Sequence, residues 1–184
     1  MVFNHINNSV SVAAVRDVYH ACAALGLLTE KTMQGLDLSP EVFEKADVRL
    51  PESTLLSLWR LLDQQMIRPG IGLAIGQTIE PSSKGLLASW VSQANTLEEA
   101  FGIFITNIEL MNPSETWKIV EHGNQITLSL ENNNAHAYPA SAFERSMSAM
   151  VSWARTLSAH AFPLDQATFT FSAPVYEGLF LPIF

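Results

Sequence analysis

The spacing of hydrophobic positions along the chain predicts a helical first half. Apolar residues recur every three or four positions over residues 11–28 and again between Pro51 and Met66, as on the buried face of a helix. Between these segments we expect a short helix at about Pro40–Ala46, because Ser39 can cap it and Pro40 suits its first turn. Residues 85–94 are expected to form another helix.

The strongest local signal begins at Thr96. Thr96 and Glu99 have the spacing of a capping box, in which each side chain accepts a hydrogen bond from the other residue's backbone N–H. An apolar stripe follows at helical spacing, and Asn112-Pro113 ends the predicted helix. The stripe consists of Leu97, Phe101, Phe104, Ile105, Ile108 and Met111.

A period of two then replaces the helical period. Apolar and polar residues alternate on both sides of a turn at His122–Gln125, which predicts a β-hairpin over about residues 115–131. A long amphipathic helix is expected at about 140–160, and a strand at about 167–173, where Phe169 and Phe171 alternate with threonines. The predicted fold class is α+β, a single domain over residues 1–184 in which the helical half packs with this small antiparallel sheet and the long helix.

Composition narrows the class of protein. Of the 184 residues 48% are hydrophobic, enough for a substantial core, and 18 acidic residues against 10 basic ones give a net charge of −8. Such an acidic chain lacks the positive surface with which proteins bind nucleic acid or anionic membranes. No stretch resembles a signal peptide or a membrane span, so we expect a cytoplasmic protein. Cys22, the only cysteine, lies on an apolar helix face and is expected to be a buried, unreactive thiol.

No catalytic, metal or cofactor signature is visible. Gly70, Gly72 and Gly76 lack the spacing of a phosphate-binding loop and indicate close backbone packing instead. The five histidines are scattered, and no pair has the i, i+4 spacing of metal ligands on a helix. Because no nucleophile, acid and base can be assembled from the sequence, we expect no enzyme, no metal and no cofactor.

The chain has no basic residue between Lys84 and Lys118, whereas aromatic residues and Met111 are concentrated there. Two interpretations remain open. The segment can be ordinary core, or the helix and the hairpin can enclose a mostly apolar cavity with a few polar groups, such as Asn107. Small-molecule pockets have that composition.

A series of short motifs, taken together and in order, resembles one known family. The family is the N-terminal, "arabinose-binding-like" regulatory domain of AraC/XylS-type transcriptional regulators, and the similarity runs from about residue 25 to the end. The motifs are Leu27-Leu28, Gly35-Leu36-Asp37, Asp47-Val48-Arg49-Leu50-Pro51, Leu58-Trp59, Pro69-x-x-Gly72-Leu73-x-Ile75-Gly76, Gly85-Leu86-Leu87, Asn95-Thr-Leu-Glu-Glu-Ala100, Glu121-x-Gly123-Asn124 with Ile126-x-Leu128-x-Leu130, and Pro174-x-Tyr176-x-x-Leu179-Phe180-x-Pro182-x-Phe184.

The resemblance implies a small-molecule-sensing, homodimeric domain of a DNA-binding regulator. In that family a helix-turn-helix region follows, and this sequence ends before one, so we expect DNA contact only through a C-terminal domain absent from this chain. The apolar central stretch favours a hydrophobic or amphipathic effector over a sugar. Arg49 could pair with an effector carboxylate or form an ordinary ion pair. The candidate ligand-binding residues are Trp90, Phe104, Asn107, Met111, Trp117 and Phe143.

The alternative function is a stand-alone protein-interaction or dimerisation module that binds no ligand. Its contact surface would be the apolar end of the chain together with Met147 and Met150 of the long helix.

Overall fold

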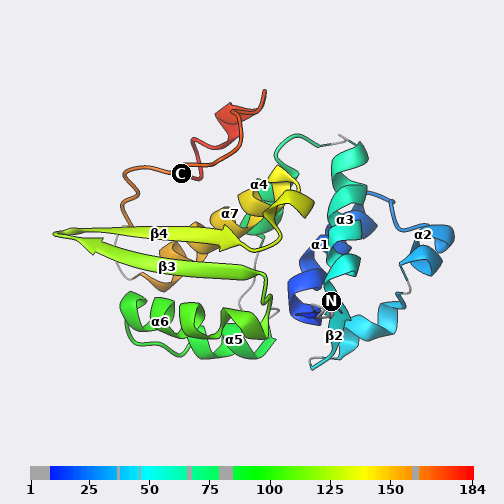
Figure 1. Ribbon diagram of the computed structural model, residues 1–184, viewed down its shortest axis with the longest axis horizontal. Coiled ribbons are helices and arrows are strands. Elements are labelled where there is room, and N and C mark those ends of the chain that lie inside the picture. Colours follow the sequence, from blue (N-terminus) through cyan, green and yellow to red (C-terminus); the bar gives the residue numbers. More distant parts are fainter. Residues whose placement is uncertain (1–8, 37, 46, 66–67, 79–84, 159–161) are drawn as a thin grey trace, which may run out of the picture.

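The computed structural model describes residues 9–36, 38–45, 47–65, 68–78, 85–158 and 162–184 (Figure 1). Its first part is helical, as predicted. The strand β1 (Ser9–Ser11) pairs antiparallel with β2 (Arg49–Pro51), and α1 (Val12–Ala24) packs against α3 (Glu52–Gln65). Ser11 caps α1, since its Oγ accepts a hydrogen bond from the backbone N–H of Ala13 at 3.0 Å.

Short elements connect these helices. The helix α2 (Glu30–Gly35) follows α1, and the helix predicted after Ser39-Pro40 is a 3₁₀-helix, η1 (Pro40–Glu44). Cys22 on α1 is fully buried, which confirms the expected position of the thiol. Burial raises the pKa of this thiol to about 12, so it stays protonated and unreactive at neutral pH.

The middle of the chain forms two helices that lie side by side below the hairpin in Figure 1, α5 (Gly85–Val91) and α6 (Leu97–Asn107). Thr96 caps α6 through a 3.1 Å hydrogen bond from the Glu99 N–H to its Oγ1. The Glu99 carboxylate accepts the N–H of Asn95 at 2.8 Å, one residue earlier than in the predicted capping box. A 3₁₀ turn, η3 (Ile108–Leu110), ends the segment before Asn112-Pro113.

The β-hairpin is confirmed. β3 (Glu115–His122) and β4 (Gln125–Asn132) pair antiparallel, with Trp117 opposite Leu130. Gly123 adopts φ +65° in the two-residue turn, a conformation that glycine takes at little cost. The two small antiparallel sheets and the helices together give the predicted α+β class.

The long helix α7 (Ala140–Leu157) follows the short turn η4 (Ala135–Ala137) and packs along α4 (Ile71–Gln77). The predicted end near His160 lies outside the described residues. Gly72 and Gly76 of α4 face α7: a Cβ at Gly72 would be 2.0 Å from the backbone oxygen of Ser141, and one at Gly76 would be 2.6 Å from that of Arg145. These glycines therefore bring the two helices close together, as the sequence indicated.

The strand predicted at 167–173 is wrong. This segment has no regular secondary structure, bends at Thr170 and Phe171, and pairs with no strand among the described residues. Its alternating pattern has another cause, since the ring of Phe169 lies 5.0 Å from Phe171, 5.2 Å from Phe180 and 5.5 Å from Phe184. The aromatic residues pack on the C-terminal turn around η5 (Glu177–Leu179) rather than on a sheet.

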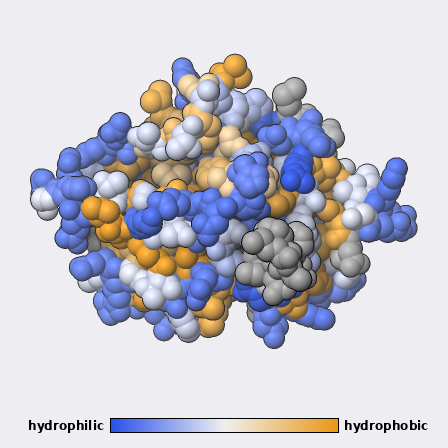
Figure 2. All heavy atoms as spheres, in the orientation of Figure 1, coloured by the Kyte–Doolittle hydropathy of each residue, from blue (hydrophilic) through white to orange (hydrophobic). Residues whose placement is uncertain are grey.

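One hydrophobic cluster extends from α1 through α3, α6 and the hairpin to α7. Figure 2 shows hydrophobic residues emerging between the hairpin and the two helices below it, on a face otherwise covered largely by hydrophilic residues. Of the helices in the described part of the chain, none has both the length and the hydrophobicity needed to cross a membrane.

Gly72→Ala should lower the free energy of unfolding by about 1–3 kcal/mol, because the added methyl group overlaps the backbone of α7. Gly102→Ala on α6 is the matched control: no atom lies within 4 Å of a Cβ at this exposed site. It should stabilise the protein by up to about 1 kcal/mol, since alanine loses less backbone entropy than glycine in a helix. Urea unfolding of both variants tests the close α4–α7 contact, and equal effects would contradict it.

Candidate functional site

A cavity of about 60 Å³ lies between α3, α6, the hairpin and α7. This is room for about four to six water-sized groups at 10–15 Å³ each. Most of the lining is apolar, as in small-molecule pockets. Its aromatic side chains are Trp59, Phe104, Trp117, Tyr138, Phe143 and Trp153, and its aliphatic and methionine side chains are Ala14, Leu55, Ile108, Met111, Leu130, Ala142, Ala149 and Met150.

The aromatic walls are built around Phe104. Its ring centroid lies 5.6 Å from Trp117 and 6.1 Å from Trp153, with interplanar angles of 74° and 77°. Edge-to-face pairs of this kind hold the rings in fixed orientations. The indole N–H of Trp153 is buried without a hydrogen-bond partner among the described residues, although buried tryptophan N–H groups usually have one.

A polar wall is formed where β3 begins beside α7. The Glu115 carboxylate accepts hydrogen bonds from the Trp117 indole at 3.2 Å, the Ser146 hydroxyl at 3.3 Å and the Asn112 amide at 3.4 Å. All three donors are neutral. All three distances are long for bonds to a charged acceptor, which are typically about 2.7–2.9 Å.

Arg145 lines the same wall from α7. Its guanidinium forms an ion pair with Asp17 of α1, donating from Nε at 2.8 Å and also from Nη2 to the same carboxylate oxygen. Burial acts to lower the pKa of Arg145, but the negative charges of Asp17 and Glu115 raise it above its ordinary value. The pair therefore places a permanent positive charge, held by Asp17, at the edge of the cavity.

Tyr138, which precedes α7, completes the polar groups of the wall. Its buried hydroxyl donates a hydrogen bond to Glu52 Oε1 at 2.9 Å. Burial, followed by this hydrogen bond and the charge of Glu52, raises the pKa of the Tyr138 phenol, so the phenol stays neutral and keeps donating. The bond joins the start of α3 to the start of α7, on opposite sides of the cavity.

The comparison with protein families bears on this arrangement. Residues 26–181 match the family described as the arabinose-binding domain of AraC transcription regulators, N-terminal. The chain belongs to this family. A search of curated proteins found no match to this chain.

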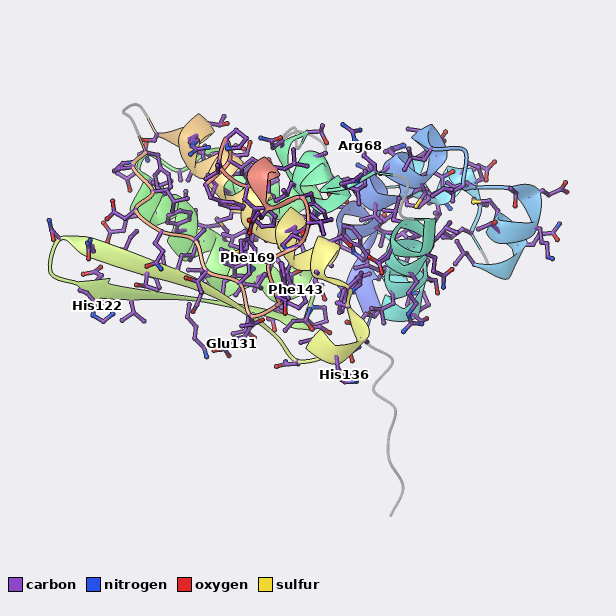
Figure 3. The ribbon with its side chains drawn as sticks, turned by 90° about the horizontal axis from the view of Figure 1, so that it is seen from above. Arg68, His122, Glu131, His136, Phe143 and Phe169 are labelled. Carbon is purple, nitrogen blue, oxygen red and sulfur yellow. The ribbon has the colours of Figure 1, made fainter. Side chains whose placement is uncertain are left out.

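Four of the six candidate residues predicted from the sequence lie together in the cavity of this AraC-type domain: Phe104, Met111, Trp117 and Phe143. Phe143 comes from α7 and is partly buried (Figure 3). Trp90 and Asn107 lie outside the lining. The Trp90 side chain, on α5, is 42% exposed, and the Asn107 amide donates to the carbonyl oxygen of Ile103 on its own helix at 2.8 Å.

Sequence reasoning missed Glu115, Arg145 and Trp153. The available signal was weak: Glu144 and Arg145 are charges in the middle of an otherwise uncharged helical segment from Ala140 to Ala154. Such charges suggest a buried pair or a site, but the sequence does not reveal their partners. Asp17, the partner of Arg145, is 128 residues away in the chain.

The other candidate groups lie away from the cavity lining. Arg49 is exposed and donates to the carbonyl oxygens of Ser9 and Leu110, joining β2 to neighbouring segments rather than forming an ion pair. His122 and His136 point outward from the hairpin turn and from η4 (Figure 3). Among the residues that the structure describes, no three His, Cys, Asp or Glu side chains are grouped where they could hold a metal ion.

Next to Arg145 on α7, Glu144 contacts the C-terminal segment of this AraC-type domain. Its side chain is fully buried, and Oε1 accepts a hydrogen bond from the Tyr176 hydroxyl at 2.8 Å. Its second oxygen, Oε2, has no partner among the described residues. Burial raises the pKa of Glu144, with a further contribution from the charge of Asp63, whereas the bond from Tyr176 acts in the opposite direction.

We predict that Asp17→Asn lowers the free energy of unfolding by about 3 kcal/mol, because it leaves the Arg145 charge buried without its carboxylate. Combining it with Arg145→Met removes that buried charge and should restore part of the stability. A double-mutant cycle in urea provides the measurement. Additive losses would show that the ion pair does not hold α1 to α7.

The raised pKa of Glu144 predicts a pH dependence of stability. The folded state keeps this proton to higher pH than the unfolded chain does, so the stabilisation is full below the ordinary value of 4.5 and is lost as pH rises through the raised pKa. Glu144→Gln should remove that decline in urea unfolding measured from about pH 4 to pH 8. Glu121→Gln, which removes an exposed carboxylate from the hairpin, is the control, and a similar change in both profiles would contradict the assignment.

Proposed function

We propose that this chain is the effector-sensing part of an AraC/XylS-type transcriptional regulator, and that the effector occupies the cavity beside α7. The observation that carries the proposal is a cavity with aromatic walls and one polar wall, whose lining lies within the family-matched region except for Ala14. DNA binding would then belong to a helix-turn-helix region outside these 184 residues. The domain acts as a sensor rather than as an enzyme, in the cytoplasm, without a metal or cofactor.

We infer a hydrophobic or amphipathic effector. The family description names arabinose, and a sugar would need many polar partners. Here the Tyr138 hydroxyl is bonded to Glu52, Arg145 to Asp17, and the Asn132 side-chain oxygen to the backbone N–H of Asn134. Few polar groups therefore remain available to a ligand within a mainly apolar lining.

The position of α7 supports a route from the cavity to the C-terminal segment. Arg145 faces the cavity, whereas the adjacent Glu144 bonds to Tyr176. An effector can change the state of the regulator only by binding one arrangement more tightly than another. A ligand that shifts α7 would therefore also move the anchor of the chain's last residues.

Homodimerisation is part of the same proposal. Exposed apolar side chains support it: Leu86 is 62% exposed on α5, and Val120 and Ile126 are about half exposed near the tip of the hairpin. The alternative, an interaction module without a ligand, predicts binding through the apolar end of the chain together with Met147 and Met150. Leu181 in that end is 83% exposed, which keeps this part of the alternative open to test. Met150 is buried and lines the cavity, which removes it from any contact surface.

A thermal-shift screen over fatty acids, aromatic acids, amines and sugars tests the function. A bound effector at 100 times its Kd should raise the melting temperature by about 5–10 °C, since it stabilises the folded state by about 2.7 kcal/mol. Ala149→Leu, which fills the cavity, and Trp117→Ala, which removes a wall, should both abolish the shift. Trp90→Ala, outside the lining, should leave it intact.

A hit whose shift survives Ala149→Leu binds elsewhere and contradicts the assignment of the cavity. Sedimentation of the chain with and without the hit separates the two functions. A dimer that no metabolite stabilises would favour the interaction module.

A further inference from the structure

We infer that the effector of this domain carries a cationic amine group, which binds against the Glu115 carboxylate within the aromatic walls. The inference rests on the proposed function and specifies the chemistry of the same cavity. It comes from three features of the lining: a carboxylate whose hydrogen bonds come from neutral donors, walls of aromatic rings, and the Trp153 indole N–H, which has no partner among the described residues.

The charges of the lining favour a cation. Two ionised side chains line the described cavity, Glu115 and Arg145. Arg145 directs two of its N–H donors to Asp17, so an effector carboxylate would have to compete with a bound carboxylate of the protein. Within the described part of the chain Glu115 accepts its hydrogen bonds from neutral donors at 3.2–3.4 Å, and a ligand ammonium group would add a shorter, charge-assisted bond.

The walls have the composition of an ammonium-binding cage. Trp59, Trp117 and Trp153 supply three indole rings, the side chain that attracts cations most strongly, and Phe104 is steeply inclined to two of them. A neutral apolar ligand would gain from the same walls but would add no charge-assisted bond to the three long hydrogen bonds that Glu115 accepts from neutral donors. A cationic headgroup would interact with the aromatic walls and with the Glu115 carboxylate.

The unpaired Trp153 N–H adds a second requirement. A buried indole donor without a partner is completed by a ligand acceptor, such as a hydroxyl oxygen next to the amine. The volume of about 60 Å³ suits a compact headgroup of a few non-hydrogen atoms rather than a long chain. Small amines that also carry an oxygen acceptor therefore fit the site best.

Isothermal titration of the chain with matched probes tests the inference. The probes are choline, its neutral carbon isostere 3,3-dimethyl-1-butanol, the anion 3,3-dimethylbutanoate, and arabinose. Choline should bind about tenfold more tightly than the neutral isostere, because the two differ only in charge. Glu115→Gln should reduce this preference to less than about threefold, whereas Glu121→Gln on the same strand should preserve it.

The wild-type comparison needs no variant, so a folding defect in Glu115→Gln would not prevent the test. Trp153→Phe provides a second variant: it should weaken choline but not tetramethylammonium, which has no hydroxyl for the indole N–H. Equal binding of choline and its isostere, tighter binding of arabinose, or tightest binding of the anion would overturn the inference and leave an effector site in place. Failure of every probe to bind at millimolar concentration would also overturn it.

Discussion

The ion pair between Asp17 and Arg145 is the interaction on which the arrangement of this domain depends. It joins the first helix to the last long helix across 128 residues of sequence, and both side chains are largely buried. A buried charge is tolerated only when its partner is held in place, so the pair fixes α7 relative to α1. Because α7 forms one side of the cavity, the pair also sets the position of the polar wall.

The same helix is held on its other faces by contacts of different kinds. Gly72 and Gly76 allow α4 to approach its backbone, whereas Tyr176 reaches Glu144 from the C-terminal segment. One contact depends on shape and the other on a hydrogen bond to a buried carboxylate. A displacement of α7 must therefore disturb both a close backbone contact and a hydrogen bond to a buried carboxylate.

Local signals predicted much of the fold, because they depend on residues close together in sequence. The hairpin, the capped helix α6 and the glycine contact of α4 each follow from a short pattern. The prediction of a strand at 167–173 was wrong because the local pattern does not decide the structure there. Phe169 and Phe171 alternate in the same way whether they face a sheet or an aromatic cluster. Only the position of Phe180, distant in sequence, decides between these outcomes.

The chemistry of the cavity could likewise be predicted from local sequence patterns only in part. Hydrophobic patterns identified four of its lining residues, three from the helix–hairpin region and Phe143 from α7. Trp90 is also a large apolar residue but lies on the exposed side of α5. The groups that give the site its charge come from elsewhere: Glu115 begins a strand, Arg145 lies on α7, and its partner Asp17 lies on α1. A pattern of hydrophobic residues finds the walls because burial is periodic. It cannot find which charges are neutralised, since that depends on which helices meet, and the pairing of Arg145 with Asp17 beside Glu115 is therefore a property of the folded chain alone.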